Sequence, residues 1–408
     1  MLTSLAYIFL LGLLLGYIFK LIRLPSLIGM LLTGIILGPY ALNALSPSLL
    51  QISPELRQIA LVIILMRAGL ALDIKELQKV GHSAVLMSIL PATLEIAGIM
   101  FIAPKLLGIT TIEAALMGTV IAAVSPAVIV PKMLFLNENK IGTKKGIPQM
   151  IMAAGSVDDV YVIILFTSFL TLATGGVVHP SDFLQIPISA LTGLTLGIIT
   201  GVALTWFFKK VHMRDSIKVV IMMSLSFLFI ALEHWFQNTI AISGLLAVIT
   251  MGAAILKTYP LLATRISPKF SKLWVAAEII LFVLVGATVD IRFAAAAGLA
   301  AVGVIFFALI FRMAGVYTSL IKTDLNTKER LFCMIAYIPK ATVQAAIGSI
   351  PLAMGLPSGN IILTVAVLAI LITAPLGAFG IDATYNKLLR HPKTPPTHPI
   401  PTDTISNT

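Results

Sequence analysis

Residues Ala153–Phe166 read AAGSVDDVYVIILF and place two adjacent carboxylates, Asp158 and Asp159, inside the apolar run Ile147–Gly175. A charged side chain near the middle of a membrane-spanning helix costs roughly 2.5–3.5 kcal/mol on insertion scales, so such charges mark functional sites. One buried carboxylate, satisfied by a hydrogen bond, can be purely structural. Two in a row are hard to explain in that way, and the pair predicts a transporter of cations.

The composition of the whole chain indicates a polytopic membrane protein. It is 58% hydrophobic and 11% charged over 408 residues, with a mean hydropathy of +1.03. A soluble protein needs far more charged surface than this. Cys333 is the only cysteine, so an internal disulfide is excluded. The first apolar run lacks a charged leader and a small-residue cleavage site, and we expect it to be a retained helix.

Apolar runs long enough to cross a hydrocarbon layer of about 30 Å recur along the chain. We expect an all-α fold with thirteen transmembrane helices, at residues 2–22, 25–42, 55–72, 77–106, 111–135, 147–174, 181–208, 216–235, 239–256, 271–289, 293–320, 329–352 and 359–386. The tail from His391 is rich in proline and polar residues and is expected to be disordered.

The distribution of Lys and Arg supports this helix count and orients the chain. Most of the 28 Lys and Arg residues fall in alternate loops on one side, and only Arg57, Lys105 and Arg292 fall in loops on the other. Because cytoplasmic loops are enriched in Lys and Arg, we expect the N-terminus outside and the C-terminus in the cytoplasm. The net charge of +11 is then loop charge facing anionic membrane lipids, and no nucleic-acid partner is expected.

Two segments of three helices, residues 77–174 and 293–386, share an organisation although their sequences differ. The first helix of each carries one buried charge, Glu95 in one segment and Arg312 in the other. By the expected topology the two segments enter the membrane from opposite sides. This pattern predicts inverted repeats, an architecture of many secondary transporters.

Proline interrupts the second helix of each segment, at SPAVIVP (Ser125–Pro131) and at IPKATVQAAIGSIP (Ile338–Pro351). Proline lacks an amide hydrogen, so it leaves a carbonyl one turn earlier without a donor. The prolines expected to break the two helices are Pro126, Pro131 and Pro339. Two such helices would bring the charged ends of half-helices together near the midplane. Lys340, next to the second break, is expected to compensate the negative ends.

These motifs resemble a known family. GSVDDVYVIILF, SPAVIVP and IPKATVQAAIGS are similar to sodium/proton antiporters of the second cation/proton antiporter family, above all to its NHA branch of animal and bacterial members. The resemblance covers about residues 77–386, and the helix count matches that of bacterial relatives. It implies the NhaA/NapA-like antiporter fold, with two crossed discontinuous helices, in a homodimer in the bacterial inner membrane.

The resemblance also implies roles for the buried charges. Asp159 matches the main ion-binding carboxylate, and Asp158 matches a neighbour that pairs with the basic residue at Arg312. Glu95 matches a branch-specific acid that bridges to this arginine. The implied division of the chain is scaffold 1–75, ion-binding core 76–175, linker helix 180–210, scaffold 213–290, core 291–390 and cytoplasmic tail 391–408.

The expected mechanism is competition for one site. Asp159 with Asp158, Ser125, Ser156 and freed carbonyls offers the hard oxygen ligands that Na⁺ or Li⁺ prefers. A buried carboxylate is unfavourable without a compensating cation, so Na⁺ and H⁺ exclude each other. The loaded site is near neutral and crosses the hydrophobic gate, whereas the empty site does not. Because arginine does not deprotonate, Arg312 favours electroneutral exchange.

Two other transport functions remain open. A K⁺/H⁺ exchanger fits the same residues, and a sodium-coupled organic-anion symporter can share the inverted-repeat fold. An intramembrane aspartyl protease needs two facing carboxylates, but consecutive helical residues point about 100° apart. The sequence has no Gly-rich phosphate loop and no His/Cys metal cluster. We therefore expect no enzyme and no cofactor, only the transported monovalent cations.

Overall fold

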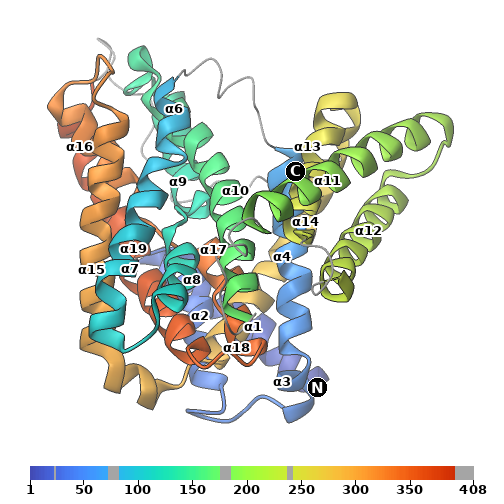
Figure 1. Cartoon of the computed structure of the whole chain (residues 1–408), viewed down its shortest axis with the longest axis horizontal. Coiled ribbons are helices and arrows are strands. Elements are labelled where there is room, and N and C mark those ends of the chain that lie inside the picture. Colours follow the sequence, from blue (N-terminus) through green and yellow to red (C-terminus); the bar gives the residue numbers. More distant parts are fainter. Residues whose placement is uncertain (23, 72–81, 175–184, 237–241, 391–408) are drawn as a thin grey trace.

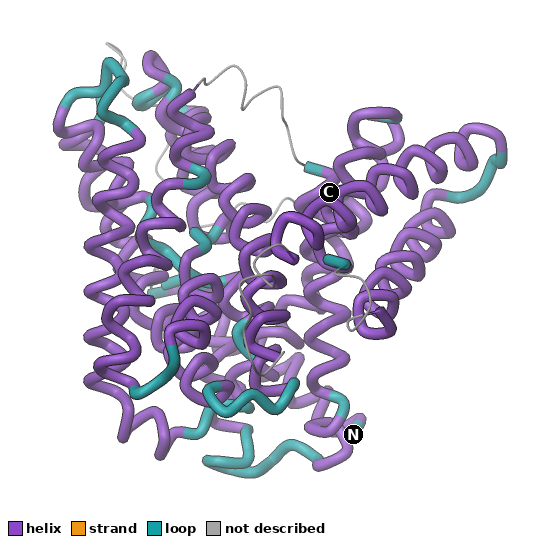
Figure 2. Tube along the Cα trace, viewed as in Figure 1, coloured by secondary structure: helices purple, strands orange, loops and turns teal. Residues whose placement is uncertain are grey.

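The computed structural model describes residues 1–22, 24–71, 82–174, 185–236 and 242–390 of the chain (Figure 1). Throughout these ranges the regular elements are helices (Figure 2). Nine spans in the described ranges are long and apolar enough to cross a membrane. The all-helical, polytopic membrane architecture expected from composition is confirmed. The expected tail, 391–408, lies outside the described residues.

The bounds of the helices follow the chain in order. The first half contains α1 (Leu2–Leu21), α2 (Ser26–Leu37), α3 (Pro47–Gln51), α4 (Ser53–Leu70), α6 (His82–Met87), α7 (Leu90–Leu107), α8 (Thr111–Ala122), α9 (Pro126–Glu138), the 3-10 turn η1 (Thr143–Lys145) and α10 (Ile147–Thr174). The second half contains α11 (Gln185–Lys210), α12 (Asp215–Phe236), α13 (Gly244–Thr258), α14 (Pro260–Ala287), α15 (Ile291–Ser319), α16 (Thr327–Ala336), α17 (Thr342–Ile347), α18 (Ile350–Ala353) and α19 (Gly359–Leu388).

The helices form two groups that lie side by side (Figure 1). In one group α7 packs along α15, and α19 packs against both α15 and α16. In the other, α14 packs against α1, α2 and α4, while α13 packs against α4 and α11. Between the groups lie α8, α10 and α17. Helix α8 contacts both α10 and α17 and also packs against α7 and α19 of the first group. Helix α10 contacts α11 and α13 of the second group, and α17 contacts α4 and α14. Helices far apart in the sequence therefore meet at the centre.

Of the helix boundaries that differ from the prediction, two have a clear local cause. The helix expected at 271–289 begins at Pro260 instead, so Arg265 lies within its first turns rather than in a loop. A helix end outside the apolar layer needs no apolar residues, and Arg265 pairs there with Asp215 at 2.8 Å. The helix expected at 25–42 ends at Leu37, because Gly38 precedes a proline and adopts an extended conformation.

The two helices that were expected to be broken by proline are both interrupted. The first ends at Ala122 and resumes at Pro126, with extended backbone at Ala123 and Ser125. The second ends at Ala336 and resumes at Thr342. The prediction that Pro131 also breaks the first helix is wrong, because this residue lies inside α9. Proline disfavours a helix interior, but membrane helices tolerate it where neighbouring groups satisfy the freed carbonyl.

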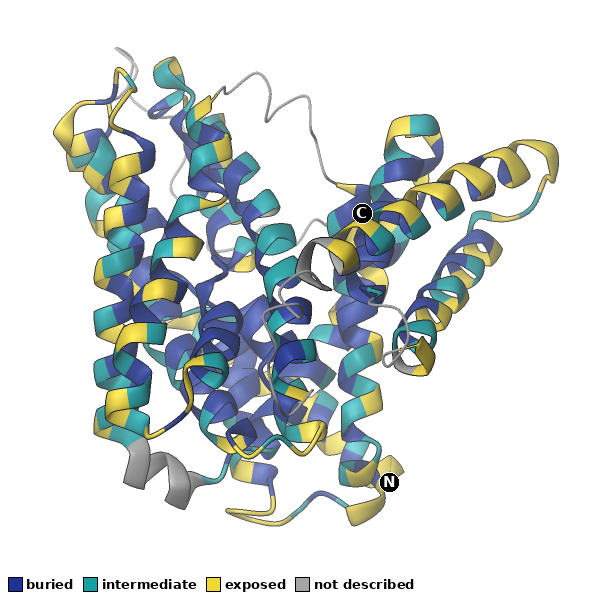
Figure 3. Ribbon diagram, in the orientation of Figure 1, coloured by how far each residue is buried: buried dark blue, intermediate teal, exposed yellow. Residues whose placement is uncertain are grey.

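The two breaks lie against each other. The amide of Ser125, at the first break, donates a hydrogen bond to the carbonyl of Pro339, at the second, at 2.8 Å. Residues 121–125 and 339–349 are all buried, and buried residues gather in this central part of the molecule (Figure 3). Backbone without helical partners is tolerated at membrane depth only where it is enclosed by protein or lines a cavity. The breaks therefore mark the centre of the candidate site.

Candidate functional site

Asp158 is fully buried on α10, opposite the first helix break. Its Oδ2 accepts a hydrogen bond from the amide of Val124 at 2.7 Å, and Arg312 Nη2 lies 3.4 Å from the same oxygen. The Val124 amide is free to donate because it lies in the extended segment after α8. The break thus supplies a backbone donor that anchors one of the two adjacent carboxylates.

Arg312, on α15, is fully buried and joins several elements. Its Nε donates to the carbonyl of Tyr337 at 2.7 Å, in the second break. Its Nη1 donates to Glu95 Oε2 at 2.8 Å and to the carbonyl of Ala122, the last residue of α8. The guanidinium thus lies between Glu95 and Asp158 and forms an ion pair with each carboxylate.

Lys340 is fully buried in the second break and shares Glu95 with the arginine. Its Nζ lies 2.8 Å from Glu95 Oε1 and donates to the carbonyl of Ile121 at 2.7 Å. The contact with the end of α8 is the kind expected for a cation that compensates a helix C-terminus. The pairing with Glu95 is an addition to the network that the sequence motifs alone did not indicate.

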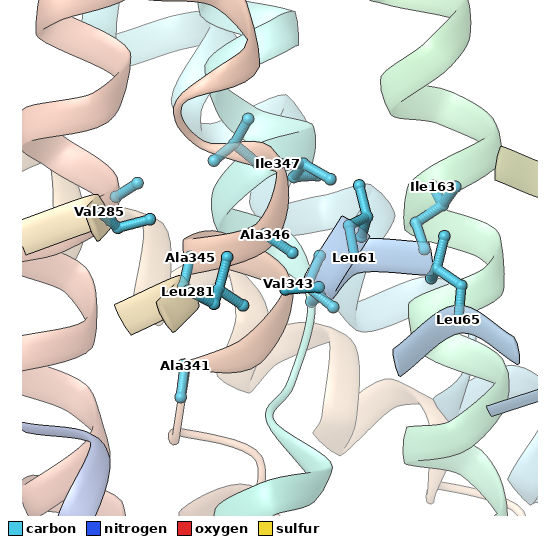
Figure 4. Close-up of a cluster of buried hydrophobic side chains, with 14 of the residues drawn as sticks. Leu61, Leu65, Ile163, Leu281, Val285, Ala341, Val343, Ala345, Ala346 and Ile347 are labelled. Atoms are coloured by element: carbon cyan, nitrogen blue, oxygen red, sulfur yellow. The ribbon is translucent and has the colours of Figure 1, made fainter. Parts of the chain in front are cut away.

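Asp159 follows Asp158 on α10 but faces a different space. It lines a small pocket formed by four helices. Apolar side chains from α4, α10, α13 and α17 form most of the wall, and Thr342 is the other polar residue among those that line it. Figure 4 shows part of this wall, with Leu61 and Leu65 of α4 beside Ile163 of α10 and Val343 of α17. The second carboxylate therefore borders a largely apolar pocket.

Three oxygens of the expected ion ligands have no hydrogen-bond partner among the residues that the structure describes. They are Asp158 Oδ1, Asp159 Oδ1 and Ser125 Oγ. Buried polar atoms are nearly always paired, so such oxygens need an explanation. Carboxylate and hydroxyl oxygens are hard ligands, and this set could bind a proton or a small alkali cation.

Of the other expected ligands, one carbonyl is occupied by a protein donor, and one serine side chain is not described. The carbonyl of Ala122, expected to be freed by Pro126, accepts a hydrogen bond from Arg312 instead. The basic side chain reaches this carbonyl because the two breaks are adjacent, which spacing along the sequence does not reveal. Ser156 lies in α10, but its side chain is outside the described part of the structure.

Two residues near the second break, Tyr337 and Gln344, contact the network although the motifs indicated no role for them. The Tyr337 ring lies 5.4 Å from the Arg312 guanidinium, and Gln344 Nε2 donates to the carbonyls of Ile121 at 3.0 Å and Ala123 at 2.8 Å. Gln344 belongs to the second proline-containing motif, and Tyr337 directly precedes it. Glutamine and tyrosine inside an apolar helical stretch were a signal that polar partners lie nearby.

Comparison with known proteins places these residues in context. Residues 7–387 match the family model described as "Sodium/hydrogen exchanger, transmembrane". Human sodium/hydrogen exchanger 9B2 is 34% identical over 387 residues, which cover 90% of this chain and 70% of that protein. Human sodium/hydrogen exchanger 9B1 is 30% identical over 399 residues, covering 92% and 76%.

A solved structure supports the fold. The sodium proton antiporter MjNhaP1 from Methanocaldococcus jannaschii, at pH 8, superposes with a TM-score of 0.80. The match covers 95% of this chain and 98% of that one, at 20% sequence identity. This likeness confirms an antiporter-type fold for the described helices.

Proposed function

The chain belongs to the sodium/hydrogen exchanger family, and on this premise we propose that it exchanges Na⁺ or Li⁺ for H⁺ at Asp159. The observation that carries the proposal is the balance of charge at the helix breaks. Three carboxylates, Glu95, Asp158 and Asp159, lie with two basic side chains, Arg312 and Lys340. Two of the negative charges are compensated, and one is not.

A cation or a proton at Asp159 balances the remaining charge. Burying an isolated charge is expensive, so the site favours an occupied state. Na⁺ and H⁺ compensate the same carboxylate and cannot both do so, which makes them competitors. The occupied site is neutral and passes the apolar wall of the pocket, whereas the empty site carries a charge and is held back. Exchange follows from this difference.

The same balance favours one H⁺ for each Na⁺. Arg312 keeps its proton at any physiological pH and holds Asp158 ionised, as does the Val124 amide. Lys340 is held between Glu95 and the carbonyl of Ile121, both of which favour its charged form. Asp159 is then the one group that gains and loses a proton, and the cycle is electroneutral.

We further propose a thirteen-span topology with the N-terminus outside and the C-terminus in the cytoplasm. Four segments would join the nine long apolar spans: Ser26–Leu37, Ser53–Leu70, Gly244–Thr258 and residues 327–353, which contain the second break. In this topology the interrupted helices run in opposite directions and cross at their breaks. The contact between Ser125 and Pro339 supports the crossing.

The pocket beside Asp159 suggests how access alternates. Its walls come from α4 and α13 on one side and from α10 and α17 on the other. We propose that α6–α10 and α15–α19 form the moving core, and that α1–α4 and α12–α14 form the scaffold of a homodimer in the bacterial inner membrane. Movement of the core against the scaffold would open the pocket to one side and then the other.

The test is ion-driven proton flux in proteoliposomes of the purified protein, with a pH-sensitive dye inside. Imposed Na⁺ and Li⁺ gradients should drive proton movement, whereas K⁺ and choline should drive little. Proton flux driven best by K⁺ would instead identify a K⁺/H⁺ exchanger. Absence of proton flux with every alkali cation would overturn the proposal and leave the organic-anion symporter as the function to examine.

A further inference from the structure

The end of α8 presents carbonyls that have no donor within their own helix, because the chain turns away after Ala122. Gln344, from α17, supplies part of what is missing. Its Nε2 donates to the carbonyl of Ile121 at 3.0 Å and to that of Ala123 at 2.8 Å. One side-chain amide therefore bridges both sides of the turn that ends the helix.

Two charged side chains also donate hydrogen bonds to this helix end, but each reaches a single carbonyl. Lys340 reaches only Ile121 among these carbonyls, and Arg312 reaches only Ala122. Both are also bound to Glu95, so their positions depend on the ionic network. Gln344 is neutral and makes no ionic contact, and its two hydrogen bonds depend only on the path of the backbone.

The path of this backbone sets the position of Asp158. Ala123 is followed directly by Val124, whose amide donates to Asp158 Oδ2 at 2.7 Å. We propose that Gln344 is a positioning residue for the ion site, which acts by fixing the turn from which Val124 reaches Asp158. The proposal rests on the proposed exchange function, and it assigns to Gln344 control of Na⁺ affinity without contact with the ion.

The orientation of the amide is determined by its surroundings. Gln344 is only 1% exposed, and its Oε1 has no hydrogen-bond partner among the described residues. The reverse orientation would place this oxygen against the carbonyl oxygens of Ile121 and Ala123, where two acceptors repel. The amide donors are therefore what the position requires, and a side chain of equal size without donors fails to replace them.

The experiment compares Gln344→Met with Gln149→Met. Methionine keeps the unbranched shape but has no donor. Gln149 is a matched control because its Nε2 donates to Asn137 Oδ1 at 2.5 Å, and its Oε1 is likewise unpaired. In proteoliposomes, Gln344→Met should raise the Na⁺ KM about tenfold, the factor expected for losing one to two neutral hydrogen bonds. The kcat should change less than about twofold, because the substitution weakens binding of Na⁺ equally in the ground state and in the transition state.

A second readout is the rise in Tm that Na⁺ produces in the detergent-solubilised protein. At a fixed subsaturating Na⁺ concentration, this rise should shrink in Gln344→Met and stay at the wild-type value in Gln149→Met. An unchanged KM and an unchanged Na⁺-dependent rise in Gln344→Met would overturn the proposal. An equal effect of Gln149→Met would also overturn it, since the change would then be a general loss of packing.

Gln344→Glu serves as the second variant if Gln344→Met does not fold. Glutamate has the same size, lacks donors when ionised and regains one when protonated. Relative to wild type at the same pH, its Na⁺ KM should be raised at pH 8 and partly restored at pH 6. An equal ratio at both pH values would contradict the role given to the donors. A wild-type protein without Na⁺-driven flux would instead refute the proposed function itself.

Discussion

Replacing Arg312 by methionine should destabilise the protein chiefly through its interaction with Glu95. The guanidinium is fully buried and contacts Glu95 at 2.8 Å and Asp158 at 3.4 Å. Removing one partner of a buried ion pair costs about 3–5 kcal/mol, since the other charge stays buried. Here Lys340 remains beside Glu95 and the Val124 amide beside Asp158, so we expect a loss near the lower end of this range.

The double variant separates this pairing from a loss of packing. Glu95→Gln alone leaves Arg312 and Lys340 without their shared carboxylate and should also destabilise. Combining it with Arg312→Met removes one charge of each sign, and the total loss should be smaller than the sum by about 1–3 kcal/mol, as for contacting residues. The free energy of unfolding is measured by SDS titration in mixed micelles without Na⁺, using tryptophan fluorescence.

Lys132 and Asp382 provide the control pair. They form a 2.5 Å ion pair, with side chains 24% and 27% exposed, that links α9 to α19 away from the breaks. A partly exposed pair contributes about 0–1 kcal/mol, so Lys132→Met should have little effect. Losses that add to within about 0.5 kcal/mol in the Arg312 and Glu95 double variant would refute the direct pairing on which the charge balance depends.

The remaining predictions concern transport. Asp159→Asn and Asp159→Cys should purify as folded protein but abolish Na⁺-driven proton flux in proteoliposomes. The matched change Asp382→Asn should retain this flux. Robust exchange by Asp159→Asn would exclude Asp159 as the ion-binding carboxylate. Ser125→Ala should raise the Na⁺ KM severalfold, because it removes a buried hydroxyl oxygen without a protein partner, and an unchanged KM would remove Ser125 from the ion ligands. Wild-type exchange should be insensitive to voltage clamped with K⁺ and valinomycin, and a flux that reverses with voltage would show that a second group releases a proton.

The helical membrane architecture could be read from the sequence because long apolar runs have few alternatives in a bilayer. Every backbone polar group must be satisfied there, and a helix does this within one segment. Helix ends outside the apolar layer are less determined, which is why the start of α14 was misplaced. Pro131 was misread because proline can also continue a helix.

The charges of the candidate site and the contacts of Arg312 with Glu95 and Asp158 were expected from the sequence, but other contacts were not. Asp158 and Arg312 stand out because buried charges are costly and must be paired. That Lys340 shares Glu95, or that Gln344 bridges two carbonyls of α8, depends on distances between segments more than 200 residues apart in sequence. Such pairings follow from tertiary packing, and neither hydropathy nor motif spacing encodes them directly.

The measurement that tests competition at Asp159 most directly is proton release on Na⁺ binding. Isothermal calorimetry of the detergent-solubilised protein, repeated in buffers of different ionisation enthalpy, gives the number of protons released for each Na⁺ bound. Where the unliganded site is protonated, we predict about one proton for each Na⁺, and neither binding heat nor proton release for Asp159→Asn. Na⁺ binding without proton release, or unchanged release in Asp159→Asn, would contradict competition of the two ions for this carboxylate.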